Sequence, residues 1–335
     1  MTDQLDQITD RILSARSRAG SIYLYPHIGV DGDALGASLA LLLVLRRLGV
    51  RARLLLDEPV PERLLFLPAL DLIEPYDEKR LDEMTADQQL ALAVDCSEGT
   101  RVGRRQALFD QAPQTAVLDH HVSGGESGNL RWIDPSAAAT GEMVFDLVSR
   151  LGSLLGEDLF SPEAATLLMT AIISDTGGFV YSNTSARTFR TAASLMANAI
   201  NLRQITYQLF DLTSQERLRL MGRVFSDAVF SHQGRLALAV ADRRLLEECG
   251  ASDGDLDGVI AHLRNVAGVE VAFLIREMKD GVLRVNIRSN EHFNAAEFAR
   301  GFGGGGHPKA AGLQMRGLSL ADAARQIIDK AGEWL

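Results

Sequence analysis

The chain has little of several features that mark particular classes of protein. Its 335 residues include only two cysteines, Cys96 and Cys249, so we expect no disulfide framework and take a cytoplasmic location as the default. The longest apolar run, residues 39–45, is far too short to span a bilayer. Residues 1–20 are polar and of mixed charge, so neither a secretory signal nor a membrane partner is expected.

Basic residues are outnumbered by acidic ones, 34 to 44, which gives a formal net charge of −10. Tight nonspecific binding of long nucleic acids depends on the neutralisation of many phosphates. The charge therefore argues against a protein that binds long duplex DNA or RNA. It is compatible with a short nucleotide in a local basic pocket, and with a carboxylate-rich site whose charge is offset by divalent metal ions.

Aromatic residues are sparse as well, at 6%. Phe179, Tyr181, Phe298 and Phe302 could each stack on a nucleobase, a contact worth about 1–3 kcal/mol, but such residues more often belong to a core. The remaining composition, with 46% hydrophobic and 23% charged residues, is that of an ordinary globular protein long enough for two domains.

Short apolar segments alternate with helical patterns over residues 1–200. The pattern predicts strands at 22–25, 50–56, 90–94 and 115–118, and helices at 4–18, 34–48, 162–174 and 186–199. Strands that are apolar throughout are typical of a sheet covered on both faces. We therefore predict an α/β fold, with a parallel sheet and flanking helices in this domain.

The rest of the chain predicts a connector and a second domain. Residues 201–230 are charged and helical in pattern, and we interpret them as a helical connector. Residues 231–335 predict a smaller α/β domain, with strands at 236–240, 269–275 and 283–287 and helices at 254–266 and 320–334.

The most informative feature is the triplet of Asp119, His120 and His121, which directly follows the apolar run 115–118. Three other apolar segments also end in acidic or imidazole side chains. These side chains are His27, Asp31 and Asp33 after the first segment, Asp95 after the second and Asp175 after the third. Catalytic residues of open α/β sheets gather at the carboxyl ends of strands, so we expect all of them to converge.

Each motif alone has an ordinary structural interpretation. The Asp31-Gly-Asp33 segment is more often a turn, His27 is more often structural, and Asp95 or Asp175 could cap a loop or a helix end. Together, however, the carboxylates would repel one another strongly. Two divalent cations about 3.5–4 Å apart would remove that repulsion and clamp a phosphoryl group. Carboxylate and imidazole donors without thiolate suit Mn²⁺ or another first-row divalent ion, so the sequence favours a two-metal hydrolase.

A glycine-rich stretch near the C-terminus predicts an anion site. Gly304, Gly305 and Gly306 precede His307, and backbone N–H groups of consecutive glycines can approach an anion closely. A flexible linker is the ordinary alternative. Arg288 ends a predicted strand, and an arginine fork binds a terminal phosphate bidentately. Arg101 is either a further phosphate ligand or a surface charge.

Taken together, these motifs resemble those of the DHH phosphoesterase family. The His27-x-x-x-Asp31-x-Asp33 segment resembles the first motif, Asp95 with Arg101 the second, Asp119-His120-His121 the third and residues 174–179 the fourth. The glycine-rich stretch that ends in His307 resembles the substrate motif of the DHHA1 domain. The resemblance spans both domains, and it implies an active site in the cleft between them.

The resemblance also implies a role for each residue. One Mn²⁺ would be bound by His27, Asp31 and Asp95, and the other by Asp33, Asp95, His120 and Asp175. Asp119 would orient a ligand imidazole, and His121 would stabilise charge on the scissile phosphate or donate a proton. The nucleotide phosphate would be bound by Arg288, Ser289, Gly304, Gly305, Gly306 and His307, with Arg101 as a further candidate.

Within the family, the chain is most similar to the nanoRNase/pAp phosphatase branch. That similarity implies Mn²⁺-dependent hydrolysis of short linear oligoribonucleotides, especially dinucleotides such as pGpG or pApA. The substrates of that branch also include pAp, from which the 3′-phosphate would be removed. A cyclic-dinucleotide phosphodiesterase uses the same catalytic core and stays an alternative. A nucleotide-binding regulator without catalysis is the alternative from another class. A homodimer is plausible for the family, and the sequence does not decide between the substrates.

Overall fold

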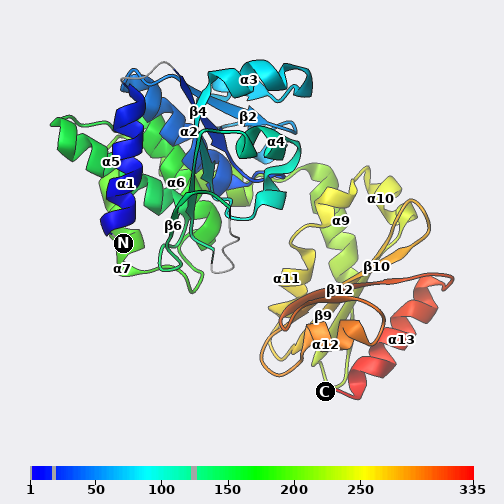
Figure 1. Ribbon diagram of the computed structural model, residues 1–335. Coiled ribbons are helices and arrows are strands. Elements are labelled where there is room, and N and C mark those ends of the chain that lie inside the picture. The colour runs from blue at the N-terminus through cyan, green and yellow to red at the C-terminus, as the bar shows by residue number, and fades with distance from the viewer. Residues whose placement is uncertain (1, 17–19, 122–126) are drawn as a thin grey trace. The chain divides into compact units, whose positions relative to one another are not determined.

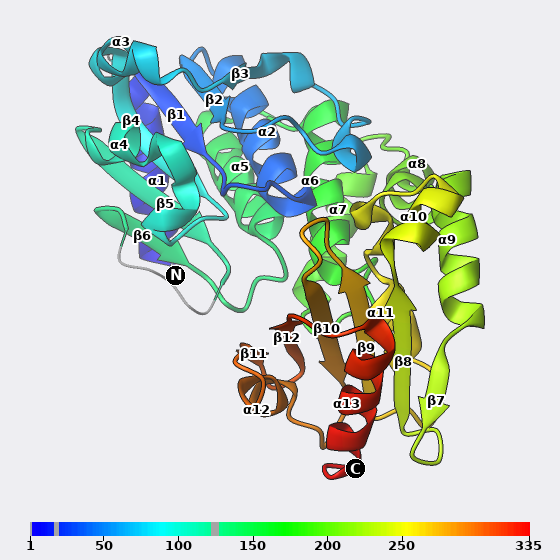
Figure 2. The same ribbon diagram turned by 90° about the vertical axis from the view of Figure 1, so that its right-hand side faces the viewer.

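The computed structural model describes residues 2–16, 20–121 and 127–335. They form two compact units, Met1–Leu212 and Thr213–Leu335 (Figures 1 and 2). The boundaries expected from the sequence, with a connector at 201–230, stay a prediction. Within the described part of the chain, no helix is both long enough and apolar enough to cross a membrane.

The first unit is built on one six-stranded sheet in which every strand pair is parallel. The strand order is β3-β2-β1-β4-β5-β6. The strands are β1 (Ser21–Tyr25), β2 (Ala52–Leu56), β3 (Ile73–Pro75), β4 (Gln88–Val94), β5 (Gln114–Asp119) and β6 (Leu130–Ile133). The predicted parallel sheet is confirmed. The edge strands β3 and β6 were not expected, because segments of three and four residues show too little periodicity.

Helices cover both faces of this sheet. They are α1 (Thr2–Arg16), α2 (Gly32–Arg47), α3 (Leu81–Asp87), α4 (Gln106–Asp110), α5 (Thr140–Leu155), α6 (Pro162–Thr176), α7 (Ala186–Met196) and α8 (Leu202–Thr206), followed by a π-helical turn at Tyr207–Asp211. Short 3₁₀ turns lie at Glu62–Leu64, Leu70–Leu72, Glu78–Arg80 and Gly99–Arg105. The sequence analysis missed α5, although its buried Met143, Leu147 and Leu151 recur at helical spacing.

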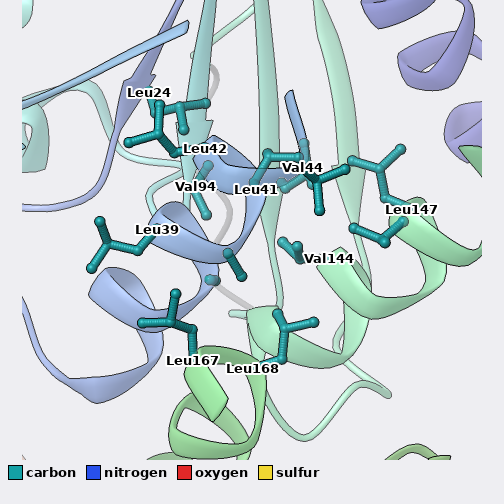
Figure 3. Packing of buried hydrophobic residues seen from close by; sticks show 14 of the residues in the cluster. Leu24, Leu39, Leu41, Leu42, Val44, Val94, Val144, Leu147, Leu167 and Leu168 are labelled. Carbon is teal, nitrogen blue, oxygen red and sulfur yellow. The ribbon is translucent and has the colours of Figure 1, made fainter. Parts of the chain in front are cut away.

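Side chains of β1 alternate between two hydrophobic clusters. Ile22 and Leu24 belong to the larger cluster, in which α2, α5 and α6 pack against the sheet (Figure 3). Tyr23 and Tyr25 point to the opposite face and pack with Phe109 of α4 and other residues. Since both faces are buried, the apolar strands of the sequence have the environment that their composition predicted.

The strand order reverses direction between β1 and β4. Chain connections run outward from β1 toward β3 on one side and from β4 toward β6 on the other. In open α/β sheets, such a switch point leaves a crevice at the carboxyl ends of the strands, where ligands bind. The loops after β1 and β4 therefore begin at the position that the topology favours for a site.

The second unit contains a mixed six-stranded sheet of order β11-β12-β10-β9-β8-β7. Only the β8–β9 pair is parallel among the described pairs of this sheet. The strands are β7 (Val229–Ser231), β8 (Leu236–Ala241), β9 (Val271–Glu277), β10 (Leu283–Ser289), β11 (Gly305–His307) and β12 (Ala310–Met315).

Helices again lie on both faces of this sheet (Figure 2). One face packs against α12 (Ala295–Arg300) and α13 (Leu320–Gly332). The other packs against α9 (Gln215–Ser226), α10 (Arg243–Cys249) and α11 (Val259–Arg264). The helix expected at 254–266 is interrupted: a 3₁₀ turn at Asp253–Leu256 precedes α11. The break lies at Gly258, whose backbone has a φ of 85°.

The glycine-rich stretch also differs from expectation, because it forms a hairpin and not an open loop. Gly305, Gly306 and His307 pair with Gly312, Ala311 and Ala310 across a tight turn. Gly306 has a φ of +145°, and a Cβ there would lie 2.5 Å from the carbonyl oxygen of Ala310. Glycine is therefore required for this edge strand to approach β12.

One buried carboxylate organises the loop between β10 and α12. Oxygen Oε1 of Glu270 accepts hydrogen bonds from the backbone N–H groups of Glu291, His292 and Phe293, at 3.1, 2.6 and 2.7 Å. Although burial raises the pKa of Glu270, these three N–H groups lower it more, and the net pKa lies below the usual glutamate value. The ionised form is thus the one that the fold stabilises.

We predict that Glu270→Gln lowers the free energy of unfolding by about 1–3 kcal/mol at pH 7, because the three N–H groups would then donate to a neutral amide oxygen and not to a charged carboxylate. A depressed folded-state pKa contributes stability above the unfolded pKa, about 4.3, and that contribution disappears as the pH falls through the folded pKa. The difference between the two proteins should therefore shrink below about pH 4. Urea titrations at pH 7 and pH 3.5 measure it, and a difference that is constant with pH would contradict the prediction.

Candidate metal centre

Six side chains from both halves of the first sheet meet at its carboxyl edge. His27 follows β1, Asp31 caps the N-terminus of α2, and Asp33 lies in the first turn of that helix. The helix thus begins two residues earlier than the pattern predicted. Asp95 follows β4, His120 follows β5, and Asp175 lies in the last turn of α6. The structure brings together all the side chains that the sequence analysis selected as metal ligands.

Their donor atoms form two groups that share one residue. His27 Nε2 lies 3.8 Å from Asp31 Oδ2 and 3.5 Å from Asp95 Oδ2. His120 Nε2 lies 3.7 Å from Asp33 Oδ2, 3.7 Å from Asp95 Oδ1 and 3.1 Å from Asp175 Oδ2. One carboxylate oxygen of Asp95 therefore faces each group.

Each of the three histidines is oriented through its Nδ1 atom. His27 Nδ1 lies 2.8 Å from the carbonyl oxygen of Ile28, and His120 Nδ1 lies 3.3 Å from that of Ala137. His121 Nδ1 lies 2.7 Å from Asp119 Oδ1. With an Nδ1 proton donated to these oxygens, each imidazole offers the lone pair of Nε2, which is the usual arrangement of a metal-binding histidine.

Asp119 orients His121 and does not itself reach the two groups of donors. Its Oδ1 also accepts a hydrogen bond from the backbone N–H of His121, at 3.0 Å. Burial raises the pKa of Asp119, but hydrogen bonds from His121 and Ser97 lower it to about 2. Asp119 is therefore an ionised partner that fixes the ring of His121, which lies with its Nδ1 3.6 Å from Asp95 Oδ1.

The carboxylates repel one another in the absence of a cation. Burial and the charges of Asp95, Asp175 and Asp31 raise the pKa of Asp33 well above its usual value. Burial likewise raises the pKa of Asp175, although the nearby imidazole of His120 opposes the shift. Such crowding is unfavourable unless positive charge is bound among the carboxylates.

The backbone of Asp95 has an unusual conformation. Its φ is +60°, a left-handed conformation that asparagine and aspartate adopt more readily than other side-chain-bearing residues. Its N–H donates to the carbonyl oxygen of Leu118 at 2.8 Å, which continues the β4–β5 pairing for one residue. The turn directs the side chain of Asp95, which is 1% exposed, toward both groups of donors.

The N-terminus of α5 completes the site, and sequence reasoning did not find it. The backbone N–H groups of Thr140 and Gly141 donate to the two oxygens of Asp33, at 2.7 and 2.8 Å. The hydroxyl of Thr140 donates to Asp95 Oδ1 at 2.8 Å. The apolar residues that follow Thr140 recur at helical spacing, and this pattern could have predicted that a helix begins at this position. The free N–H groups at the start of a helix favour an anion such as the Asp33 carboxylate.

We predict that Thr140→Val weakens binding of Mn²⁺ by about 10- to 100-fold, the usual effect of removing a partner of a ligand. Valine keeps the shape and the backbone N–H but cannot donate to Asp95. Titration calorimetry on the metal-free protein measures the affinity. Thr140→Ser retains the hydroxyl and serves as the control, which should bind nearly as tightly as the wild type. Equal affinities of the valine variant and the wild type would contradict the prediction.

The chemistry of the donor set fits two divalent metal ions. Within each of the groups His27–Asp31–Asp95 and Asp33–His120–Asp175, the ligand atoms lie within 4.8 Å of one another. Nε2 of His120 is buried and makes no hydrogen bond, as expected for a nitrogen whose partner is a cation. Imidazole and carboxylate donors suit a first-row divalent ion.

Arg101 lies in the 3₁₀ turn beside the loop of His27. Its carbonyl oxygen accepts a hydrogen bond from the N–H of Ile28 at 2.8 Å. Among the described residues, no ion pair or side-chain hydrogen bond engages its guanidinium. The charge of Arg101 is close enough to Cys96, the neighbour of Asp95, to oppose the rise that burial causes in the thiol pKa.

In the second unit, Arg288 and His307 occupy equivalent positions on two strands that flank β12. Arg288 on β10 and His307 on β11 both pair with Ala310 of the strand between them. Directly opposed residues point to the same face, so both side chains lie on the face opposite to buried Ile287. Ser289, by contrast, is 3% exposed, and its hydroxyl donates to the carbonyl oxygen of Pro308 at 3.3 Å. A direct ligand role for Ser289 does not fit this burial.

Two family models match the chain. The one described as "DHH family, N-terminal domain" matches residues 21–172, and the one described as "DHHA1 domain" matches residues 237–335. The bifunctional oligoribonuclease and PAP phosphatase NrnA of Thermus thermophilus is 35% identical over 317 residues, which cover 94% of this chain and 90% of that protein. NrnA of Bacillus subtilis is 27% identical over 308 residues, or 90% of this chain and 91% of that protein.

A solved structure has the same fold along the whole chain. An exopolyphosphatase-related protein from Bacteroides fragilis superposes with a TM-score of 0.86 at 24% identity, over 99% of this chain and 96% of that one. The matched domains, the extent of the sequence similarity and the carboxylate–imidazole site agree. The chain therefore belongs to the DHH family of phosphoesterases, as a phosphoric ester hydrolase with an N-terminal DHH domain and a C-terminal DHHA1 domain.

Proposed function

We propose that this protein is a Mn²⁺-dependent phosphodiesterase that hydrolyses short linear oligoribonucleotides, dinucleotides such as pGpG or pApA above all, to mononucleotides. Removal of the 3′-phosphate from pAp is the second activity of the proposal. The main support is the position of Asp95, whose two oxygens face two separate groups of metal-binding side chains. The choice of substrate is supported by the activities after which the NrnA relatives are named, oligoribonuclease and PAP phosphatase.

The proposal assigns the six side chains to two metal ions. His27 and Asp31 would bind one ion, Asp33, His120 and Asp175 the other, and Asp95 both. When bound, the two ions would activate a water nucleophile and offset the charge of the phosphoryl group. The protein keeps the ligands in place through the N–H groups and the hydroxyl at the start of α5.

His121 is assigned the proton transfer. The hydrogen bond with Asp119 raises the pKa of His121 above the usual histidine value, although burial opposes the shift. The ring is 42% exposed, unlike that of His120, so it is accessible to a substrate. We assign to it the donation of a proton to the leaving oxygen, or charge stabilisation on the phosphate.

A terminal phosphate is assigned to the second unit. Arg288 offers a bidentate fork, and His307 on the same face adds a donor beside the free edge of β11. Gly304, Gly305 and Gly306 leave that edge without side chains, so backbone N–H groups can approach an anion. We assign Ser289 to the positioning of the turn at Pro308 and Lys309, and Arg101 to the phosphate near the metal centre.

Product analysis with a matched panel of substrates tests the proposal. Purified protein with Mn²⁺ would be given pGpG, pApA, a longer oligoribonucleotide, pAp and a cyclic dinucleotide, before and after treatment with a chelator. We expect rapid conversion of linear dinucleotides to mononucleotides, slower attack on the longer chain, loss of activity after chelation and recovery with Mn²⁺. His120→Ala is the inactive control.

Two other results would change the assignment. Cleavage of the cyclic dinucleotide alone would make the protein an enzyme that opens signalling nucleotides. Absence of cleavage with every substrate, while the protein still binds Mn²⁺ and a nucleotide, would favour a regulator without catalysis.

A further inference from the structure

Three aromatic rings are exposed around the turn that follows the metal-centre residue Asp175. Tyr181, Phe189 and Phe210 are 59%, 57% and 51% exposed, and we refer to these three residues as the aromatic surface cluster. They come from three segments: the turn after α6, the first half of α7 and the π-helical turn after α8. The helices α7 and α8 each pack against α6 (Figure 2).

Each ring contacts one of three consecutive residues of that turn. A Cβ on Gly177 would lie only 2.4 Å from the ring of Tyr181, so the ring lies directly on the glycine backbone. A Cβ on Gly178 would lie 3.4 Å from the ring of Phe210. Phe189 stacks on Phe179, with the ring centroids 5.5 Å apart and the planes inclined by 23°.

The turn itself is fixed by hydrogen bonds and is close to the metal centre in sequence and in contact. The N–H groups of Val180 and Tyr181 both donate to the carbonyl oxygen of Thr176 at 3.0 Å. The side-chain amide of Asn183 donates to the carbonyl oxygens of Asp175 and Ala138, at 3.1 and 2.9 Å. Ala138 belongs to the segment that leads into the N-terminus of α5.

The backbone of the turn is also strained at a bulky residue. Phe179 has a φ of +71°, which is rare for a phenylalanine and unfavourable for an isolated chain. Gly177 and Gly178, with φ values of 56° and 72°, precede it. Three consecutive left-handed residues, each in contact with an exposed ring, thus begin two positions after Asp175. Strain of this kind persists where the surrounding structure enforces it, and it clusters at binding sites.

We propose that the aromatic surface cluster is the base-binding subsite of the enzyme, on which a nucleobase of the bound short nucleotide stacks. The inference rests on the proposed function. Stacking on an aromatic ring is tolerant of base identity, because every base has a π-face. The subsite therefore accounts for affinity for nucleotides in general, and selection among bases is left to other contacts.

The rings have the properties that such a subsite needs. They are flat and exposed, but each is seated against the backbone or a second ring, so little conformational entropy is lost on binding. They contact the turn that starts two residues after Asp175, and the proposal places the base on this turn while its phosphate is at the metal centre. Aliphatic contacts alone would not give the preference for planar ligands that aromatic faces give.

Substitution of the rings, read out by both hydrolysis and equilibrium binding, tests the inference. Tyr181→Ala and Phe189→Ala should each raise KM for a linear dinucleotide by about 5- to 100-fold, the usual effect of losing one stacked base. Tyr181→Phe keeps the ring and should restore KM to within about twofold. Leu154→Ala removes a side chain that is 47% exposed near the far end of α5, and it should leave KM unchanged.

A substrate without bases separates stacking from other effects. For a sugar–phosphate diester that lacks both bases, the alanine variants and the wild type should have equal KM, because no ring contact exists to be lost. The affinity for Mn²⁺, measured by calorimetry, should be unchanged in Tyr181→Ala. A rise in KM for the baseless diester that equals the rise for the dinucleotide, or no rise for either, would overturn the inference.

Binding without hydrolysis distinguishes this inference from the proposed function. The fluorescence of 2-aminopurine riboside 5′-monophosphate is quenched when its base stacks, so titration with the protein reports the subsite directly. Quenching by the wild type and by Tyr181→Phe, with loss in Tyr181→Ala and Phe189→Ala, would support the inference even if no nucleotide were cleaved. Conversion of a dimer to a monomer by the alanine variants in size-exclusion chromatography, without loss of quenching, would identify the cluster as a contact between copies and overturn it.

Discussion

Replacing Asp95 with asparagine should reduce kcat/KM for a linear dinucleotide by about 10³-fold or more. Removal of a single preorganised electrostatic contact already costs about 10²–10³-fold in other enzymes, and this carboxylate faces both groups of donors, with its two oxygens 3.5 and 3.7 Å from His27 and His120. Asparagine has nearly the same shape, tolerates the left-handed backbone and can still accept from Thr140. The loss would therefore follow from the missing charge and not from a disturbed fold.

Although Asp95→Asn should lose activity, its stability without metal should not fall. The charge of Asp95 raises the pKa of its buried neighbour Asp33, so in the metal-free protein the substitution relieves repulsion. We expect metal-free Asp95→Asn to melt at the same temperature as the wild type or higher, while the increase that Mn²⁺ gives the wild type becomes small. Initial rates and thermal melts with and without Mn²⁺ measure both effects.

A matched control is available for this variant. Asp71→Asn changes an exposed aspartate in a 3₁₀ turn and should alter neither rate nor metal dependence. Turnover of Asp95→Asn within about tenfold of the wild type would refute the assignment of Asp95 to both metal ions.

Replacing Arg105 with methionine should lower the free energy of unfolding by about 3–5 kcal/mol, the usual result of removing one partner of a buried ion pair. The side chains of Arg105 and Asp57 are only 1% and 7% exposed, with Nε and Oδ1 3.0 Å apart. The guanidinium also donates to the carbonyl oxygens of Leu55 and Pro26, at 2.6 and 2.9 Å. Methionine would leave the carboxylate without its buried counter-charge, with the backbone N–H of Arg104 still donating to it at 2.8 Å, and would remove one donor from each carbonyl group.

The effect should extend to the metal centre, because Pro26 directly precedes His27. We expect urea unfolding to show the loss of stability, and calorimetry to show weaker Mn²⁺ binding. The double variant Arg105→Met with Asp57→Asn should recover part of the stability, since it no longer leaves a charge unpaired. Arg80→Met removes an ion pair with Glu83 in which the two side chains are 46% and 63% exposed. This substitution should leave the stability almost unchanged, because solvent screens exposed pairs. Equal effects of the two arginine substitutions would contradict this account.

The strand-end residues could be predicted from the sequence because their signals are local. An apolar segment that ends in His27 or Asp95 is visible in a few residues, and the rule that catalytic side chains gather at carboxyl ends of parallel strands applies before any coordinates are known. The same holds for the parallel sheet, whose strands are apolar throughout because both faces are covered.

Residues that act through the backbone could not be found in this way. Thr140 and Gly141 bind Asp33 through their N–H groups, which every residue except proline has, so no residue type marks the position. The buried position of Ser289 was also invisible, because a one-residue step along β10 turns its side chain away from the face of Arg288. The hairpin of Gly304 to His307 formed where composition suggested a loop, because β12 supplies the hydrogen bonds.

By itself, the sequence determined the fold class, the edge of the sheet on which the candidate site lies and the chemical type of its proposed metal ligands. Each of these depends on the local hydrophobic pattern and on side-chain chemistry, and both are visible in short stretches of the sequence. Only the tertiary structure decided that Asp95 faces two groups of donors, that the start of α5 fixes Asp33, and that Tyr181, Phe189 and Phe210 meet around one turn. Those relations depend on distances between segments far apart in the chain, which only the packing of helices on the sheet sets.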